Sequence, residues 1–424
     1  MARILLLNFG SLGDLHPFIG MAIALQKAGH EVSLASNPIY LPRIEAAGIK
    51  AHGVGPKLSP DDPELIKAVM SPLRGPELLH KKYIFPHSEQ SIEETLPLAR
   101  NSDLLITGIL GYFVPTLSEL TQVPWAMAML APMGYWSAHD PAALPAIPFL
   151  RSFKFMGPRF YKQLYKLLFL PSKSWSAPLQ EARKKHGLAP QANPMAPATL
   201  NSCALNLALF SKHFAPPQAD WPKNLKQVGF IEYDGEEAKA PLNENIEKFL
   251  ANGEAPILLT LGSTNVLDPG KIYETFHEAV HPLNKRTLIS VATKDLAYYQ
   301  AKFSNNNTLV TDYIPYGKVM PKSSFVVHQG GIGTTAQCLR AGKASIILAS
   351  VNDQVDNARH VEKIGAGLYL AKKKLNAASL RKAILKVEKS TLQTNAQKIG
   401  EKIKSENSCE KLVSAVKDLL ANKD

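Results

Sequence analysis

The sequence has few cysteines and no long apolar run. Cys203, Cys338 and Cys409 are the only cysteines in 424 residues, and their odd number and wide spacing argue against a disulfide framework or a cysteine zinc site. No stretch reaches the roughly 18 uninterrupted apolar residues of a membrane helix, since the closest, 123–136, is broken by Pro132. The first apolar run is too short for a signal peptide. We therefore expect a cytoplasmic protein.

Metal and dinucleotide motifs are also missing from the sequence. No DxD-like carboxylate pair follows a predicted strand, and no Cys or His residues have metal-ligand spacing. The acidic stretch 234–237 falls in a segment that looks like a solvated turn. An oxidoreductase would carry GxGxxG after the first strand and an acid near the end of the second, which GSLGDL at 10–15 does not supply. We expect no metal and no resident cofactor.

The charge balance is basic. The chain has 48 Lys and Arg against 36 Asp and Glu, a net charge of +12. Such a surface suits nucleotides, phosphorylated substrates or an anionic membrane, although a solvated basic surface without a specific partner fits equally. We expect no nucleic-acid partner. Hydrophobic residues make up 45% and charged residues 20%, which is typical of a soluble globular protein of two domains.

Strand and helix signals alternate along the chain and then restart. RILLLN at 3–8 and EVSLAS at 31–36 predict buried parallel strands, with a helix between them that begins near Pro17 and ends before Gly29. The pattern begins again at 255–263. We therefore predict an α/β fold of two doubly wound halves. The predicted parts are an amino-terminal domain at 1–215, a Pro- and Gly-rich linker at 216–239, a second domain at 240–400, and a helix at 401–424 that docks on the domains.

A glycine-rich turn follows the predicted strand SFVVH. Backbone N–H groups at the start of the next helix form an anion site there. Gly330, Gly331 and Gly333 would let a diphosphate approach the main chain. Thr334 could cap the helix or donate to a phosphate, and His328 could donate to a phosphate oxygen. The alternatives are a tight strand–helix turn and a histidine that is merely packed.

The next predicted strand ends in a polar loop with Asp353, Gln354 and Asn357. Carboxylate and amide groups suit sugar hydroxyls. A helix cap beside a solvated loop would use the same residues. Because carboxyl ends of neighbouring parallel strands share one edge, we expect this loop and the glycine turn to act together.

These motifs resemble those of the family 1 inverting nucleotide-sugar glycosyltransferases, which have the GT-B fold of two Rossmann-like domains facing across a cleft. The segment 10–36 looks like the amino-terminal motif of bacterial members and of sterol glucosyltransferases. The segment 214–236 resembles the linker of the bacterial branch that includes the rhamnolipid rhamnosyltransferases. The residues similar to the family's donor signature are His328, Gly330, Gly331, Asp353, Gln354 and Asn357.

The resemblance implies an activity. A hexose of the glucose or rhamnose type would move, with inversion and without a metal, from a UDP- or dTDP-sugar to a hydroxyl of a hydrophobic or lipid-like acceptor. The donor would bind mainly in the carboxyl half and the acceptor mainly in the amino half. A nucleotide-sugar epimerase or hydrolase on the same fold, and a non-catalytic lipid-binding protein, stay open as alternatives.

The resemblance also assigns roles near the first strand. Asp14 matches the position of the base in the sterol and bacterial branch, and His16 is the reserve base. Gly10, Ser11 and Gly13 would form a close backbone turn near donor or acceptor. Alternatively, Asp14 caps the helix near Pro17 and His16 packs beside it.

Two further pairs are implied donor contacts. Ser263 and Thr264 would contact the diphosphate, unless they form a plain strand-end turn. Tyr313 and Ile314 occupy the region where the family seats the nucleotide base, with a ring for stacking and backbone amides for the pyrimidine edge. A buried core aromatic is the alternative for Tyr313.

The stretch 151–173 is basic and rich in aromatic and aliphatic residues, with no acidic residue. Such a stretch could lie on an anionic membrane surface, which would make the protein peripheral to the inner face of the membrane. An amphipathic helix packed on its own domain is the alternative.

Overall fold

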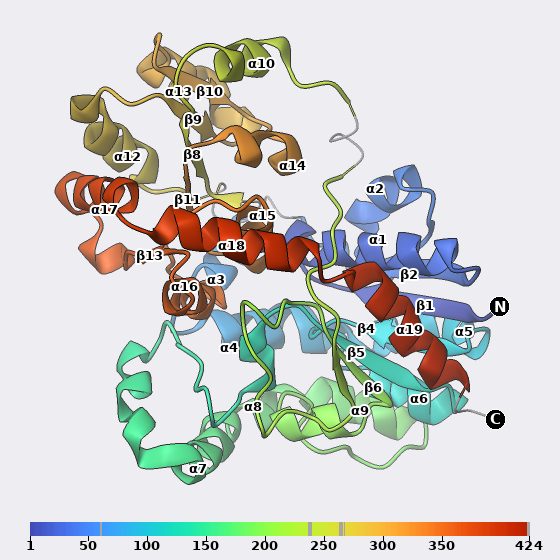
Figure 1. Ribbon diagram of the computed structural model, residues 1–424. Helices are drawn as coiled ribbons and strands as arrows, with labels where there is room; N and C mark the ends of the chain where they lie inside the picture. Colours follow the sequence, from blue (N-terminus) through green and yellow to red (C-terminus); the bar gives the residue numbers. More distant parts are fainter. Residues whose placement is uncertain (60–61, 236–239, 263–265, 267, 422–424) are drawn as a thin grey trace. The chain divides into compact units, whose positions relative to one another are not determined.

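The chain folds into two compact units (Figure 1). The computed structural model describes residues 1–424 except 60–61, 236–239, 263–265, 267 and 422–424. The first unit comprises Met1–Tyr233 and the described residues from Asn407 onward, and the second comprises Asp234–Glu406.

A seven-stranded parallel sheet forms the centre of the first unit, in the order β3-β2-β1-β4-β5-β6-β7. The chain leaves β1 in one direction and returns to β4 on its other side, so the strand order reverses between these two strands. The strands are β1 (Arg3–Asn8), β2 (Glu31–Ser36), β3 (Lys50–Gly53), β4 (Leu104–Thr107), β5 (Trp125–Met129), β6 (Leu205–Ala208) and β7 (Leu225–Gln227).

Helices cover both faces of this sheet. Ile4 and Leu6 face one side of β1 and Leu5 and Leu7 the other, and all four are buried. Continuous apolar strands are stable only in such a position. The α-helices are α1 (Leu12–Lys27), α2 (Leu41–Ala46), α3 (Pro63–Val69), α4 (Gly75–Leu79), α5 (Ser88–Arg100), α6 (Val114–Thr121), α7 (Gly157–Phe169), α8 (Ser172–Trp175), α9 (Ala177–Lys185) and α19 (Ser408–Ala421). Further short helical segments are η1 (Pro38–Tyr40), η2 (His80–Ile84), η3 (Phe85–His87), η4 (Pro132–Tyr135), η5 (Pro148–Met156) and η6 (Pro197–Asn201).

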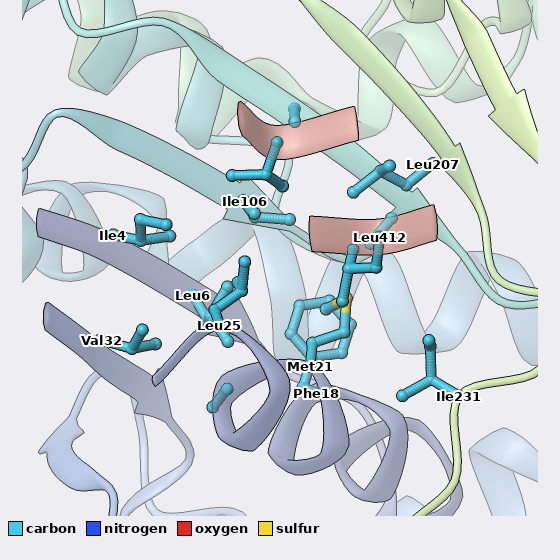
Figure 2. Close-up of a cluster of buried hydrophobic side chains, with 14 of the residues drawn as sticks. Ile4, Leu6, Phe18, Met21, Leu25, Val32, Ile106, Leu207, Ile231 and Leu412 are labelled. Carbon is cyan, nitrogen blue, oxygen red and sulfur yellow. The ribbon is translucent and has the colours of Figure 1, made fainter. Parts of the chain in front are cut away.

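The last helix, α19, completes the core of the first unit. Figure 2 shows Phe18 and Met21 of α1 beside Leu412 of α19 and the strands. Leu412 and Val416 are fully buried, and burying a leucine side chain stabilises a fold by about 1.5–3 kcal/mol. In the predicted segment 401–424, the residues up to 404 belong to a helix of the second unit, and α19 packs on α1.

The second unit has a six-stranded parallel sheet in the order β10-β9-β8-β11-β12-β13, which reverses between β8 and β11. Its strands are β8 (Ile257–Thr260), β9 (Thr287–Ser290), β10 (Thr308–Thr311), β11 (Val326–His328), β12 (Ser345–Ile347) and β13 (Gly367–Tyr369). Its α-helices are α10 (Glu244–Ala251), α12 (Ile272–Val280), α13 (Leu296–Phe303), α14 (Tyr316–Val319), α15 (Ile332–Arg340), α16 (Gln354–Lys363), α17 (Ala377–Lys389) and α18 (Leu392–Lys404). Single turns are η8 (His281–Leu283), η9 (Thr293–Asp295), η10 (Met320–Lys322) and η11 (Lys372–Lys374).

The Pro- and Gly-rich segment predicted as a linker contributes to the first unit. It holds the edge strand β7, and Trp221, Phe230 and Ile231 are buried. The two units divide between Tyr233 and Asp234, about 18 residues beyond the predicted end of the first domain. Proline is tolerated beside an edge strand, so its presence did not mark the boundary.

The helix after β1 begins earlier than predicted. Ser11 is its N-cap and Leu12 its first residue, which places Pro17 inside α1 rather than in its first turn. Asp14 therefore occupies the third helical position.

Within the described part of the chain, no helix is both long and apolar enough to cross a membrane.

Candidate functional site

The glycine turn joins β11 to α15, at the point where the strand order of the second sheet reverses. Gly331 is the N-cap of α15, and glycine offers no side-chain acceptor to the first-turn N–H groups. Those N–H groups lack partners within the helix, and the helix dipole places partial positive charge there. The turn therefore has the chemistry of an anion site.

His328 is buried at the end of β11, and its two ring nitrogens have different surroundings. The Gly330 N–H donates to Nδ1 at 3.1 Å. Nδ1 is therefore an acceptor, and the ring proton of the neutral form lies on Nε2. Nε2 is buried and has no hydrogen-bond partner in the described structure. Burial lowers the pKa of His328 to about 3, so the ring stays neutral. The Nε2–H group of His328 is thus a buried donor without an acceptor among the described residues.

Gly330 must be glycine. Its φ is +91°, which disfavours any residue with a Cβ. An added Cβ would lie 2.6 Å from Cγ2 of Ile347 and 3.0 Å from the backbone oxygen of Gln354. Close packing on β12 and on the start of α16 therefore fixes the path of the turn.

Asn357 ties the turn to the loop after β12. Its Nδ2 donates to the Gly330 carbonyl at 2.9 Å and to Asp353 Oδ2 at 2.7 Å. The side-chain carbonyl of Gln354 accepts from the backbone N–H groups of Ser350 and Val351 at 3.3 and 3.4 Å. Asn357 therefore connects the two loops that were predicted to act together. The Gln354 side-chain carbonyl instead bonds to backbone groups within its own loop.

A pair of hydroxyls, from Thr260 of β8 and Tyr316 of α14, lies beside the turn. The hydroxyls of Thr260 and Tyr316 are 2.6 Å apart, and Thr260 pairs in register with His328 across the sheet. Burial raises the pKa of Tyr316, while hydrogen bonds with Thr260 and Thr334 oppose the rise. Sequence reasoning missed Thr260 and Tyr316, although the end of β8 was a recognisable strand end.

The other predicted donor residues divide into three kinds. Tyr313 is 45% exposed, so its ring is not part of the core. Ile314 is buried in the core cluster with Val326. Ser263 and Thr264 lie outside the described residues.

In the first unit, Asp14 closes a capping arrangement at the start of α1. Its Oδ2 accepts from the Ser11 N–H at 2.7 Å and from the Ser11 hydroxyl at 2.8 Å. A Cβ on Gly10 would lie 2.5 Å from Asp14 Cγ, so only glycine leaves room for the carboxylate. Burial raises the pKa of Asp14, and the hydrogen bonds from Ser11 oppose that rise.

Tyr40 and His16 differ in their relation to the Asp14 carboxylate. Burial raises the pKa of Tyr40 to about 12, and the charge of Asp14 adds to the shift. His16 lies two positions along α1, about 200° around the helix from Asp14. Its ring meets Tyr233 edge-on at 5.5 Å between centroids. Asp14 and His16 therefore lie on different sides of α1. Gly13 lies in the first turn of the helix, between Leu12 and Asp14.

A pocket lies beside the loop between β1 and α1, where β1, β2, β3 and β4 end. Aromatic and aliphatic side chains dominate its wall, with a few polar groups, a composition that suits an apolar ligand with a polar end. The residues that line it are Phe9, Asn37, Val54, Gly55, Pro56, Leu58, Tyr83, Ile84, His87, Ser88, Ser91, Leu110, Tyr112 and Phe113.

One wall of this pocket is held by a buried histidine. His80 donates through Nδ1 to the Pro76 carbonyl at 2.5 Å, so Nε2 accepts from the Tyr112 hydroxyl at 3.1 Å. Trp175 of α8 stacks on His80, with 6.2 Å between ring centroids. Sequence reasoning missed this pocket because its residues come from five separate segments of the chain. The available signal was the ends of the strands, where four of these segments begin.

Comparisons with known proteins agree with this architecture. Residues 291–419, which include both loops of the anion site, match the family described as the erythromycin biosynthesis protein CIII-like C-terminal domain. The chain is 27% identical to O-mycaminosyltylonolide 6-deoxyallosyltransferase of Streptomyces fradiae, with 96% of this chain and 95% of that protein covered. It is 26% identical to a sterol 3-beta-glucosyltransferase of Komagataella phaffii over 96% of this chain but 33% of that protein, so it spans about a third of that relative's length.

The solved structure of glycosyltransferase VinC in complex with dTDP matches the whole chain, with a TM-score of 0.70, 20% identity and 100% coverage of both chains. The chain is a glycosyltransferase of the GT-B type. The predicted fold and enzyme class of this glycosyltransferase are confirmed. Across its described residues, no group of three or more His, Cys, Asp or Glu side chains is placed to hold a metal ion.

Proposed function

We propose that this glycosyltransferase moves a hexose of the glucose or rhamnose type from a UDP- or dTDP-sugar to a hydroxyl of a hydrophobic acceptor, with inversion and without a metal or other cofactor. The buried and unpaired Nε2–H of His328, at the start of α15, is the observation that carries the proposal. A buried donor without an acceptor is costly, and a diphosphate oxygen would supply that acceptor.

The donor diphosphate would bind at the glycine turn. The first-turn N–H groups of α15 and the His328 ring would both donate to it, and their charge distribution would stabilise the leaving diphosphate. The dTDP in the solved VinC complex supports a nucleoside diphosphate as ligand. Asp353, next to the turn and bound by Asn357, would accept hydrogen bonds from sugar hydroxyls. The exposed ring of Tyr313 remains our proposed stacking partner for the base.

Asp14 would be the general base. Its raised pKa improves proton abstraction near neutral pH, because the best base has a pKa close to the working pH. The acceptor hydroxyl would give its proton to Asp14 as its oxygen attacks the anomeric carbon. The bond from that carbon to the diphosphate oxygen would break on the opposite face, and its electron pair would leave with the nucleoside diphosphate. This single displacement inverts the anomeric centre.

The acceptor would bind in the pocket of the first unit. Apolar side chains such as Leu58, Leu110 and Phe113 line that pocket, which supports a hydrophobic acceptor. Tyr112 would orient the acceptor because its hydroxyl is fixed by His80. On the same proposal the enzyme works in the cytoplasm and meets lipid-like acceptors at the inner face of the membrane.

A donor screen tests this function. The protein is incubated with UDP-glucose or dTDP-rhamnose and a panel of hydrophobic alcohols, and the products are identified by mass spectrometry and the anomeric configuration by NMR. We expect a glycoside of inverted configuration. Free sugar alone would indicate a hydrolase, an isomerised nucleotide-sugar would indicate an epimerase, and stabilisation by NAD but not by UDP or dTDP in a thermal shift assay would refute the proposal.

A further inference from the structure

The segment from Phe149 to Lys173 has two faces with different roles. Its inward face is a small core in which Leu150, Tyr161 and Tyr165 are buried. The Tyr161 hydroxyl donates to the Leu150 carbonyl at 2.6 Å, and the Tyr165 hydroxyl donates to the Ser137 carbonyl at 3.2 Å. For these residues, the alternative of an amphipathic helix packed on its own domain is therefore correct. The segment is anchored, so its outward side chains are displayed on a fixed support.

The outward face carries large apolar side chains that are exposed in the described structure. Phe155 is 82% exposed, and Leu167 and Leu170 are each 63% exposed. Most exposed large hydrophobic side chains of the described residues lie within this one segment: Phe149, Phe153, Phe155, Met156, Leu167, Leu168 and Leu170. A soluble protein rarely gathers such side chains without a partner.

Basic residues accompany these apolar side chains. Asp140 pairs with Arg151 and Lys154. The remaining basic residues of the segment are exposed and have no ion pair within the described parts of the chain: Arg159, Lys162, Lys166 and Lys173. The outward surface is therefore apolar and positively charged at once.

We propose that this outward face, at 149–173, docks on an anionic lipid bilayer. The aromatic and aliphatic side chains would enter the boundary between headgroups and acyl chains, and the four basic residues would meet the negative headgroups. A second copy of the chain fits the face poorly, because a symmetric contact would bring the same positive charges together.

The docking face is connected to the acceptor pocket. The segment leads directly into α8, where Trp175 stacks on His80, and His80 holds Tyr112 in the pocket wall. This step rests on the proposed function: an acceptor held in the membrane would then lie close to the pocket in which it binds.

Vesicle sedimentation tests the docking face. The full chain is mixed with phosphatidylcholine vesicles or with vesicles that also contain phosphatidylglycerol. We expect binding to the anionic vesicles only. The double variant Phe155→Ser with Leu167→Ser should bind at least tenfold more weakly. Lys162→Gln with Lys166→Gln should bind roughly twentyfold more weakly, because each basic residue near an anionic surface contributes on the order of a fivefold change.

Leu73→Ser is the matched control, since Leu73 is 75% exposed but lies outside the segment, and it should bind like the unchanged protein. UDP or dTDP affinity, measured on each variant, should stay unchanged. Equal binding of all variants, or no binding of the unchanged protein, would overturn the docking face. A dimer in light scattering that the double variants dissociate would show that the face joins two copies instead. Failure of sugar transfer alone would refute the proposed function and leave the vesicle result intact.

Discussion

Replacing His328 separates the roles of its two ring nitrogens. His328→Asn keeps an acceptor near the position of Nδ1 for the Gly330 N–H, but it removes the Nε2–H donor. A hydrogen bond to a charged group is worth about 1.5–3 kcal/mol. The dissociation constants of UDP and dTDP should therefore rise by roughly 10- to 150-fold in isothermal titration calorimetry.

His328→Gln is the complementary variant. Its amide nitrogen reaches toward the position of Nε2, whereas the Gly330 N–H loses its acceptor. We expect a smaller loss of nucleotide affinity but a free energy of unfolding lower by about 1–3 kcal/mol, the cost of an unsatisfied buried donor. Chemical denaturation measures that free energy.

The pH dependence of stability provides a second reading of the same site. The folded-state pKa of His328 is about 3 and its unfolded value is about 6.5. The unfolded chain therefore binds the extra proton between these values, and stability falls as pH drops below 6.5. At pH 5 the contribution of His328 to this loss is about 2 kcal/mol, and His328→Asn should remove that contribution. Unchanged nucleotide affinity in His328→Asn, together with unchanged pH dependence, would refute this account of His328.

Other variants test the remaining parts of the account. Asp14→Asn should lower kcat by about 10²- to 10⁴-fold with little change in UDP or dTDP affinity, and near-normal turnover would remove Asp14 as base. Ser11→Ala removes the hydroxyl hydrogen bond that lowers the pKa of Asp14 and leaves the one from the backbone N–H, so the acid limb of kcat/KM should move to higher pH, and a downward move would contradict this. Gly330→Ala should lower the free energy of unfolding of the second unit by roughly 1–3 kcal/mol more than Gly270→Ala does. Both glycines have positive φ, but of the two only Gly330 lacks room for a Cβ. Equal losses in the two variants would show that the turn can adjust. Tyr112→Phe should raise the acceptor KM several-fold and leave the donor KM unchanged. Steady-state kinetics measure both values, and a raised donor KM with an unchanged acceptor KM would contradict this role.

The sequence predicted most reliably where one physical requirement dominates. The first two strands have the predicted bounds, Arg3–Asn8 and Glu31–Ser36. For the first, the reason is that a strand buried on both faces needs a continuous apolar run. The glycine turn was recognisable because only glycine permits the positive φ at Gly330.

Other features depend on contacts that no local pattern encodes. β7 has three residues in a Pro-rich segment, so pairing with β6 rather than propensity defines it. The start of α1 was misplaced because the run from Gly10 to Asp14 looked like a loop, whereas Asp14 and Ser11 cap the helix. The wall of the pocket, including Tyr112, is assembled from segments far apart in sequence.

A crystal structure with bound UDP or dTDP would show whether the diphosphate binds at His328 and the start of α15. We expect a diphosphate oxygen within about 3.2 Å of His328 Nε2, with another facing the first-turn N–H groups of α15. A nucleotide bound away from this turn, with Nε2 still unpaired, would contradict it.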